Sequence, residues 1–368
     1  MGDIRCGEVL ARRLLSFGIA AAVAMLGAVG MAQSASAKTK VTAEIVGDVL
    51  TVTGTKNRDL IALRLADNDP GTLQVALGRS ERVVASFDRA ALSSVYVHLG
   101  DGDDSLRVDE SHGTFTDIQS LTVDAGPGRD LLNGGSGGET FIGGPGADSV
   151  RGGAGDDALE WHPGDGSDAL DGQAGFDSVV IRGSDSEDSV EVSADASWAL
   201  LDFNADRTRS IDVERFAINT SSGADSIVVD DLTATSVTDV QIAVALAGGD
   251  GVDDGVLVMG TAADDVIVAL GDANGVAIIG LASLVNIVGA QSNDILNIDA
   301  LSGNDTVEAS GLTVGTPSFT AYGRDGDDVL IGGDGDDFLL GGEGDDVLIG
   351  GPGIDILDGG PGDNVVIQ

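Results

Sequence analysis

Through most of residues 38–368, short runs of alternating apolar and polar residues follow clusters of Gly, Asp and Asn. Alternation with a period of two predicts half-buried strands, and the clusters before the strands predict turns. In segments such as 57–65, 223–232, 262–270 and 291–298, an Asp stands directly before the apolar run. No convincing amphipathic helix occurs. The pattern therefore predicts an all-β chain of short strands joined by tight turns.

The pattern is most regular at the C-terminal side, where a nine-residue unit repeats without a gap. Five units fit G-G-x-G-x-D-x-U-x, with U a large apolar residue: 323–331, 332–340, 341–349, 350–358 and 359–367. Their sixth positions hold Asp328, Asp337, Asp346, Asp355 and Asn364, and their eighth positions hold Leu330, Leu339, Leu348, Leu357 and Val366. A disordered acidic linker would not keep a large apolar residue at every eighth position.

A second array of the same unit lies at 125–180, preceded by a single unit at 99–107 that contains Asp104. The sixth positions of this array are Asp130, Glu139, Asp148, Asp157, Asp168 and Asp177. Trp161 and His162 form a two-residue insert, which we interpret as a surface interruption of the repeat.

Stacking of the units explains the repeat, because one turn and one short strand cannot bury an apolar face alone. If two units form one flattened coil, units two apart lie above one another at the usual strand spacing of about 4.8 Å. Asp328 should then lie near Asp346, and Asp337 near Asp355. The eighth-position side chains should form an inner ladder, as in a β-solenoid.

Composition indicates what holds such coils together. The formal charge of −42 excludes nucleic acid as a direct partner and favours divalent cations that take oxygen ligands. Two carboxylates about 5 Å apart repel by roughly 3 kcal/mol at an effective dielectric constant of about 20, so stacked aspartates need a cation. The 56 glycines allow turns with positive φ and leave room where a Cβ would obstruct inward-pointing carbonyls. We therefore expect Ca²⁺ to be the cofactor and folding to depend on it.

The first 37 residues have the features of a secretory signal. Basic residues (Arg5, Arg12, Arg13) precede an apolar stretch at 14–32, and small residues end the segment at Ala37. We expect cleavage after Ala37, no transmembrane anchor afterwards, and a secreted or surface-associated protein. The export route, general secretory or twin-arginine, stays open. The only cysteine, Cys6, would be lost, so disulfides cannot stabilise the mature chain.

On these nonapeptides the chain resembles the hemolysin-type calcium-binding (RTX) repeat proteins. The resemblance implies a right-handed parallel β-roll or β-solenoid in which turn aspartates and turn carbonyls bind calcium between stacked turns. The ligand candidates that it implies are Asp104, Asp130, Asp148, Asp157, Asp168, Asp177, Asp328, Asp337, Asp346 and Asp355, with the turn glycines Gly333, Gly335, Gly342, Gly344, Gly351 and Gly353. Glu139 and Asn364 depart from the family's Asp, so calcium sites at these two positions are in doubt.

We expect five segments: the signal at 1–37, strand-rich coils at 38–98, a first roll array at 99–181, a divergent solenoid at 182–322 and a second roll array at 323–368. The chain has no H-E-x-x-H motif, and Ser136 matches G-x-S-x-G only as a variable position of a repeat. Residues 202–214 begin like an EF-hand loop, but Arg207 and Val213 replace its Gly and Glu, so we interpret them as a polar β-turn.

The functional expectation is a calcium-binding repeat protein without catalysis, with a structural, adhesive or matrix-binding role. Its partners would be calcium ions and an extracellular polysaccharide or surface matrix. The alternative is a β-solenoid lyase or epimerase acting on extracellular polysaccharide, which would need a groove around residues 182–320. The oligomeric state is left open.

Overall fold

The structure, a computed structural model, describes residues 40–114, 118, 120–244 and 251–368. Residues 39–368 form one compact unit. The predicted signal at 1–37 lies outside the described residues. Within the described ranges, no helix is long and apolar enough to cross a membrane.

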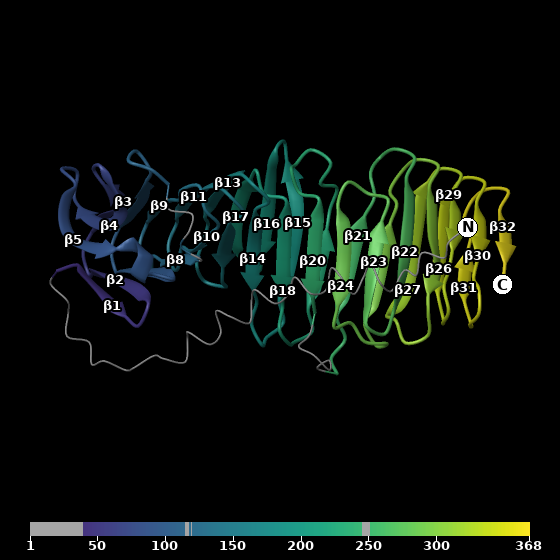
Figure 1. Cartoon of the computed structure of the whole chain (residues 1–368). Coiled ribbons are helices and arrows are strands. Elements are labelled where there is room, and N and C mark those ends of the chain that lie inside the picture. The colour runs from purple at the N-terminus through teal and green to yellow at the C-terminus, as the bar shows by residue number, and fades with distance from the viewer. Residues whose placement is uncertain (1–39, 115–117, 119, 245–250) are drawn as a thin grey trace, which may run out of the picture. The chain divides into compact units, whose positions relative to one another are not determined.

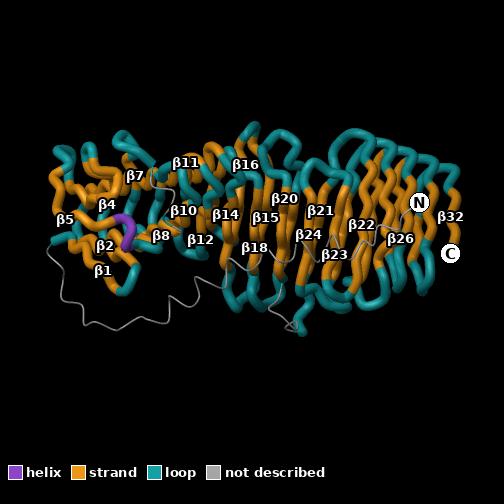
Figure 2. Tube along the Cα trace, in the orientation of Figure 1, coloured by secondary structure: helices purple, strands orange, loops and turns teal. Residues whose placement is uncertain are grey.

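Among its described residues, the unit is all-β apart from a short 3-10 turn, η3 (Arg89–Ala91). Its strands form two sheets of 16 strands each, stacked along one axis (Figures 1 and 2). Sheet A contains, in spatial order, β1 (Thr42–Val46), β2 (Val49–Thr55), β6 (Ser94–Gly100), β8 (Ser120–Asp124), β10 (Glu139–Ile142), β12 (Ala158–Trp161), β14 (Ser178–Arg182), β18 (Arg215–Asn219), β20 (Asp239–Ala243), β24 (Leu284–Val288), β23 (Gly275–Ile279), β22 (Val266–Asp272), β26 (Thr306–Leu312), β28 (Val329–Ile331), β30 (Val347–Ile349) and β32 (Val365–Ile367). Sheet B contains β5 (Arg82–Asp88), β4 (Asp69–Leu77), β3 (Leu60–Ala66), β7 (Ser105–Asp109), β9 (Leu131–Asn133), β11 (Ser149–Ala154), β13 (Ala169–Ala174), β17 (Asp206–Ile211), β16 (Trp198–Phe203), β15 (Ser189–Asp195), β19 (Ser226–Val229), β21 (Gly255–Met259), β25 (Ile295–Asp299), β27 (Ser318–Asp325), β29 (Phe338–Glu343) and β31 (Ile356–Asp358).

The predicted solenoid and its two units per coil are confirmed. Successive units of the C-terminal array alternate between the sheets, so β28, β30 and β32 pair in parallel in sheet A while β29 and β31 pair in sheet B. Leu330 lies opposite Leu348, and Leu348 lies opposite Val366. Leu330, Leu339 and Leu348 are fully buried, which makes the eighth position the inner ladder of the core.

Antiparallel pairs end or interrupt the parallel stack at four places, of which β1–β2 ends sheet A. β3–β4–β5 closes one end of sheet B, β15–β16–β17 lies within sheet B, and β22–β23–β24 lies within sheet A. The prediction of a parallel β-roll missed these meanders, because an antiparallel strand shows the same alternation as a parallel one. The segment 202–214 forms the β16–β17 hairpin, with Asn204 at φ 53°, so its interpretation as a polar β-turn is confirmed.

The two internal meanders compensate for one another. Each adds two strands to one sheet without adding any to the other, and they lie in opposite sheets. As a result both sheets contain 16 strands, so the two sheets have the same number of layers along the stack.

The Trp161–His162 insert is not a surface interruption, as the sequence had suggested. Trp161 is 1% exposed and ends strand β12, where its ring centroid lies 5.2 Å from that of Phe203. Its Nε1 donates to the carbonyl of Gly166 at 3.1 Å. The insert therefore brings the largest side chain of the core inward, where it packs on the β15–β17 meander.

Candidate calcium sites

The sixth-position carboxylates form columns that run from coil to coil at the entrance of each strand. In each step, the backbone N–H of one sixth-position residue donates to Oδ1 of the sixth-position Asp in the following coil. Before the strands of sheet B, the donors Asp59, Asp104, Asp130 and Asp148 reach Asp104, Asp130, Asp148 and Asp168 at 2.7 to 2.8 Å. We call this row the sheet-B column.

A second row, the sheet-A column, stands before the strands of the other sheet. The N–H groups of Glu139 and Asp157 donate to Asp157 and Asp177 at 2.7 and 2.8 Å. In the C-terminal array, the N–H of Asp328 donates to Asp346 at 2.9 Å before the strands of sheet A. The N–H of Asp337 donates to Asp355 at 3.1 Å before the strands of sheet B. The two predicted neighbour pairs are thus confirmed, and Asp337 and Asp346 belong to different columns.

All ten aspartates singled out from the sequence lie on these columns, and each is 0 to 9% exposed. The hydrogen bonds along the column use only Oδ1. Among the described residues, the buried Oδ2 atoms without a hydrogen-bond partner include those of Asp104, Asp130, Asp148, Asp157, Asp177, Asp305, Asp328 and Asp346. A buried carboxylate oxygen without a donor is costly unless a cation binds it.

All five units of the C-terminal array begin with glycine, and in the four that contain Asp a carboxylate oxygen lies where a Cβ on this glycine would stand. A Cβ built on Gly323 would lie 2.2 Å from Asp328 Oδ2 and 2.5 Å from the carbonyl oxygen of Gly341 in the next coil. At Gly341 the corresponding distances are 2.2 Å to Asp346 Oδ2 and 2.8 Å to the Gly359 carbonyl. A carboxylate and a carbonyl from successive coils thus converge at a point that any other residue would fill.

The turn glycines fall into two groups. Gly335, Gly342 and Gly344 have positive φ of 128°, 119° and 143°, and Gly351 has a φ of 106°, a region that only glycine enters at low cost. Gly333 and Gly353 do not belong to this group. A Cβ on Gly353 would lie 1.8 Å from the Gly335 carbonyl, and one on Gly333 would lie 2.8 Å from the Ala309 carbonyl. The carbonyls of successive turns therefore point along the stack, toward the next coil.

The electrostatics of the columns favour a bound cation. Burial, followed by the charges of Glu139 and Asp177, raises the pKa of Asp157 to about 8. Burial also raises the pKa values of Asp130, Asp148 and Asp168 to about 7. Without a cation these carboxyls therefore hold protons near neutral pH, and a divalent ion would replace those protons.

The columns extend into coils that the repeat pattern did not assign as sites. The sheet-B column resumes after its meander through Asp188, Asp225, Asp254 and Asp294 at 2.9 to 3.0 Å. Before the C-terminal array, Asp265 donates to Asp305 at 2.7 Å and Asp305 donates to Asp328 at 2.8 Å. The Asp that precedes each apolar run was visible in the sequence, and it was the signal for these residues.

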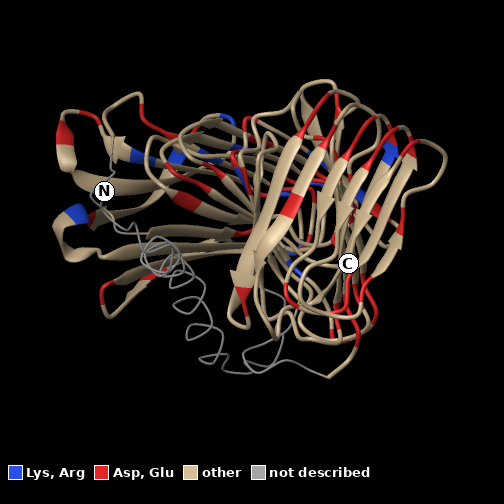
Figure 3. Ribbon diagram, turned by 90° about the vertical axis from the view of Figure 1, so that its right-hand side faces the viewer, with Lys and Arg blue, Asp and Glu red and all other residues tan. Residues whose placement is uncertain are grey.

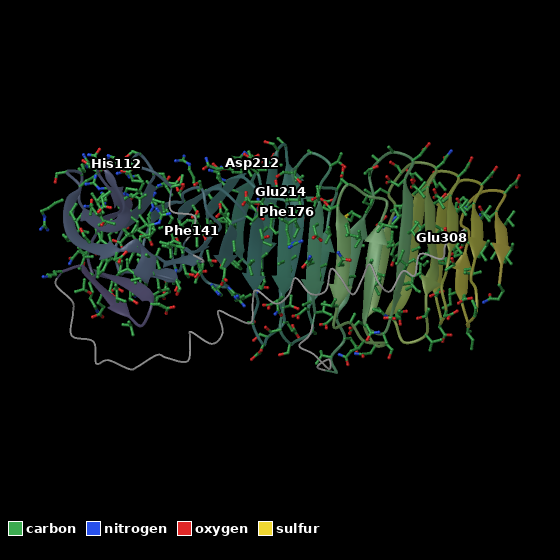
Figure 4. The ribbon with its side chains drawn as sticks, viewed as in Figure 1. His112, Phe141, Phe176, Asp212, Glu214 and Glu308 are labelled. Carbon is green, nitrogen blue, oxygen red and sulfur yellow. The ribbon has the colours of Figure 1, made fainter. Side chains whose placement is uncertain are left out.

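Three described column positions hold Asn or Glu in place of Asp: Asn364 ends a column, whereas Glu139 and Glu214 continue one. Asn364 accepts the N–H of Asp346 at 2.7 Å, and its own Nδ2 donates to the Gly360 carbonyl, so its amide needs no cation. Glu139 is buried like the aspartates and accepts the N–H of Gly135 at 3.1 Å. Glu214, which the sequence did not single out, accepts the N–H of Asp177 at 2.8 Å through Oε2 (Figure 4).

Side chains alone do not complete a metal site. In the part of the chain that the structure describes, no three Asp, Glu, His or Cys side chains converge on one point. The six to eight oxygens that calcium takes would therefore include backbone carbonyls, which the turn glycines expose. The column carboxylates and these carbonyls fit such an ion in number, charge and hardness.

One cavity in the described part of the divergent segment is too small to be a substrate groove. It measures about 10 Å³, room for one water molecule, and is lined by residues that include Asp231, Leu232, Met259 and Ser283. A wider depression of about 380 Å³ lies outside this segment, on strands β4 and β5, among Asp69, Thr72, Ser86 and Asp88.

Comparison with known proteins assigns the repeats. No curated protein matches the chain significantly. The family model of the RTX calcium-binding nonapeptide repeat matches residues 133–160, 320–348 and 340–367. These ranges contain β10, β11, most of β12 and β28 to β32, with the column residues between them. The chain is therefore a β-solenoid that carries RTX calcium-binding nonapeptide repeats.

Proposed function

We propose that this chain is a secreted protein whose coils become ordered when the aspartate columns bind calcium, and that its role is structural or adhesive rather than catalytic. One observation carries the proposal. In the described part of the chain, the buried Oδ2 atoms of Asp157, Asp328 and Asp346 have no hydrogen-bond partner, and each lies with a carbonyl oxygen of the next coil where the Cβ of a non-glycine residue would stand. A structure that needed no cation would pair these oxygens with N–H groups.

The residues that would hold calcium are the column aspartates together with turn carbonyls of successive coils. Calcium supplies positive charge between carboxylates that otherwise repel one another by roughly 3 kcal/mol per close pair. Because the unfolded chain does not hold these oxygens together, the binding free energy stabilises the folded state. Export into calcium-rich surroundings would then trigger folding.

Circular dichroism of residues 38–368 tests calcium-dependent folding. In chelator we expect a weak β signal, and titration with calcium should restore it with a sharp transition. Calorimetry on the same sample should give several calcium ions per chain. A β signal that is equally strong in chelator and in calcium would overturn the proposal.

The proposed lack of catalysis and the adhesive role need separate measurements. Uronate-containing polysaccharides should not be shortened or epimerised by the calcium-loaded chain, and turnover that survives purification would refute this part. Sedimentation of the protein with insoluble extracellular polysaccharide, with calcium and with chelator, tests the matrix partner. Calcium-independent binding, or none, would remove the adhesive role and leave a structural one.

A further inference from the structure

Basic residues are confined almost entirely to one half of the stack. After Arg215 the chain contains a single Lys or Arg, Arg324, whereas acidic residues continue into the last coil. Figure 3 views the stack from its C-terminal side and shows the predominance of Asp and Glu there. The placement of the arginines in the other half therefore decides where this acidic protein could bind an anion.

Arginines face outward from one stretch of sheet B. On β3, β7, β9, β11, β13 and β17 the charged residues at outward positions are five arginines and two aspartates, Asp109 and Asp171. The arginines are Arg64, Arg107, Arg151, Arg207 and Arg209. On the matching strands of sheet A, β2 to β14, the outward positions carry one arginine, Arg182, against Asp124 and Glu160. This stretch of sheet B is thus a locally basic face.

The strand register brings two of these arginines into one row. Arg107 lies opposite Asn133, Asn133 lies opposite Arg151, and Arg151 lies opposite Asp171, with one residue in each successive layer. Because layers are about 4.8 Å apart, the two arginines are separated by about 10 Å along the stack. The row alternates a cationic side chain with one that can hydrogen-bond a hydroxyl group.

A row of small and apolar residues runs beside the first row. Its members, in successive layers, are Ser105, Leu131, Ser149, Ala169 and Arg209. The Arg209 guanidinium lies 4.8 Å from the centroid of the Trp198 ring, and β16 places Trp198 beside Ile211, in line with Asp171. Arg107, Arg151 and Arg209 therefore stand on every second strand, β7, β11 and β17. We call these two rows the arginine strip.

The chain itself leaves part of this charge available. The Arg151 side chain is 54% exposed, and its Nε lies 3.8 Å from Asp171 Oδ2, beyond hydrogen-bond distance. Arg209 is exposed, and among the described residues it forms no ion pair with a carboxylate. Arg107 is paired with two neighbouring carboxylates but is still 46% exposed. The strip therefore offers guanidinium N–H donors to a ligand.

The spacing of the strip identifies the class of ligand. Two layers, about 10 Å, are close to the length of two sugar residues in an extended β-1,4-linked chain, where alternate residues turn the same side to a surface. A uronate at each of these positions would place a carboxylate on each arginine, and a guanidinium binds a carboxylate through two parallel N–H bonds. Between the arginines, Asn133 and Asp171 can bond sugar hydroxyls, and Leu131, which is 42% exposed, can contact a sugar ring.

A nucleic acid fits the strip less well. Each of its strands carries a phosphate about every 3.4 Å, so its charge density far exceeds that of one arginine in every second layer. The rest of this chain, with a formal charge of −42, would repel the unpaired phosphates.

Calcium would assist binding without touching the ligand. The strands β7, β9, β11 and β13 follow Asp104, Asp130, Asp148 and Asp168 of the sheet-B column. Ions bound to these carboxylates would remove negative charge beside the strip.

We propose that the arginine strip binds an extended acidic polysaccharide along the stack, with uronate carboxylates on Arg107, Arg151 and Arg209. The inference rests on the proposed function, because export would bring the chain to extracellular polysaccharide. It adds the surface that binds this partner and the charge that the partner carries.

Fluorescence anisotropy of a labelled β-1,4-oligoglucuronate with residues 38–368 in calcium tests the proposal. Binding should saturate and weaken with added salt, and a cello-oligosaccharide of the same length, which has the same backbone without carboxylates, should bind at least about tenfold more weakly. Arg151→Gln and Arg209→Gln should each reduce the affinity about tenfold, and Asn133→Asp should also reduce it by placing a carboxylate between two arginines. The control Arg79→Gln removes the same charge from an exposed residue in the turn between β4 and β5, and it should bind like wild type.

Other results would overturn the proposal. Equal affinities of Arg151→Gln, Arg209→Gln and Arg79→Gln would show that the strip is not the binding surface and that any binding occurs through calcium bridges. Equal affinity for the cello-oligosaccharide would exclude recognition of carboxylates, and equal affinity for a single-stranded RNA would indicate non-specific binding of polyanions.

Calcium calorimetry and circular dichroism on the same samples separate the strip from the proposed calcium-dependent folding. The strip variants should bind as much calcium as wild type. A chain that folds with calcium but does not bind the oligoglucuronate would overturn the strip alone. A chain that folds equally well in chelator would contradict calcium-dependent folding, and the same anisotropy measurement in chelator would still test the strip.

Discussion

Gly143 gives the most direct test of why most units begin with glycine. A Cβ at this position would lie 2.6 Å from Oδ2 of Asp148 and 3.3 Å from its Cβ and Cγ, and these are the three nearest atoms. The clash is therefore with the carboxylate itself and not with the backbone of another coil. Gly143→Ala should displace the Asp148 carboxylate, and overpacking of this kind costs about 1–3 kcal/mol of folding free energy.

A double-mutant cycle isolates the effect. In the Asp148→Ala background the nearest remaining atom is the Cβ at 3.3 Å, so Gly143→Ala should cost much less there. We expect a coupling free energy of about 1–2 kcal/mol from urea unfolding at saturating calcium, within the usual range for contacting residues. Calorimetry should also show fewer calcium ions bound to Gly143→Ala than to wild type.

The matched control uses a glycine that is required for a different reason. At Gly335 a Cβ would meet nothing within 4 Å, but φ is 128°. Gly335→Ala should therefore cost backbone strain alone, and this cost should not change when Asp337 is replaced by Ala. Additivity within about 0.5 kcal/mol at the Gly143–Asp148 pair would refute the idea that the carboxylate excludes the methyl group.

Three further predictions follow from the columns and the core. Burial raises the pKa values of the column carboxyls, to about 8 for Asp157, so the folded state holds protons that the unfolded chain releases near pH 4. In chelator, the thermal midpoint of unfolding should therefore fall as the pH rises from about 4 to 8. In calcium, where protons compete with the ion, the midpoint should instead fall on acidification through the same range; the same trend in both buffers would contradict the assignment. Asp305→Asn should remove bound calcium in a calorimetric titration, whereas the exposed neighbour Asp264→Asn should not, and equal losses would argue against a site on the column. Trp161→Ala should lower the free energy of unfolding in calcium by about 3–5 kcal/mol. Phe176→Ala, at a ring that is 39% exposed and lies against the Arg215 guanidinium, should cost only about 1 kcal/mol. Equal effects at the two positions would contradict the place of Trp161 in the core.

The nonapeptides contained enough information to predict the parallel coils. Their period sets two units per coil, so the neighbours Asp328–Asp346 and Asp337–Asp355 followed from strand spacing alone. The meanders did not follow, because β16 shows the same alternation of buried and half-buried residues as the roll strands beside it. What distinguishes it is the backbone at Ala196 and Asn204, whose positive φ values of 56° and 53° reverse the chain.

The extent of the columns was hidden for a related reason. In the divergent coils, Ser221 and Leu301 stand where the repeat has its second glycine, yet they keep positive φ values of 71° and 74°. The turn conformation is thus conserved within this chain while the residue that normally supports it is absent. A pattern based on glycine misses these coils, whereas the Asp before the apolar run identifies them.

Two units per coil also restrict how the length of such a chain can change. Column partners in the C-terminal array are 18 residues apart, so loss or gain of 18 residues removes or adds one whole coil and leaves every other strand in its sheet. Loss of nine residues would transfer all later strands to the opposite sheet. If this happened between the two internal meanders, both meanders would lie in the same sheet, and together they would add four strands to that sheet and none to the other. Variants of this architecture should therefore differ in length by pairs of units, and the spacing of the meanders should keep its parity.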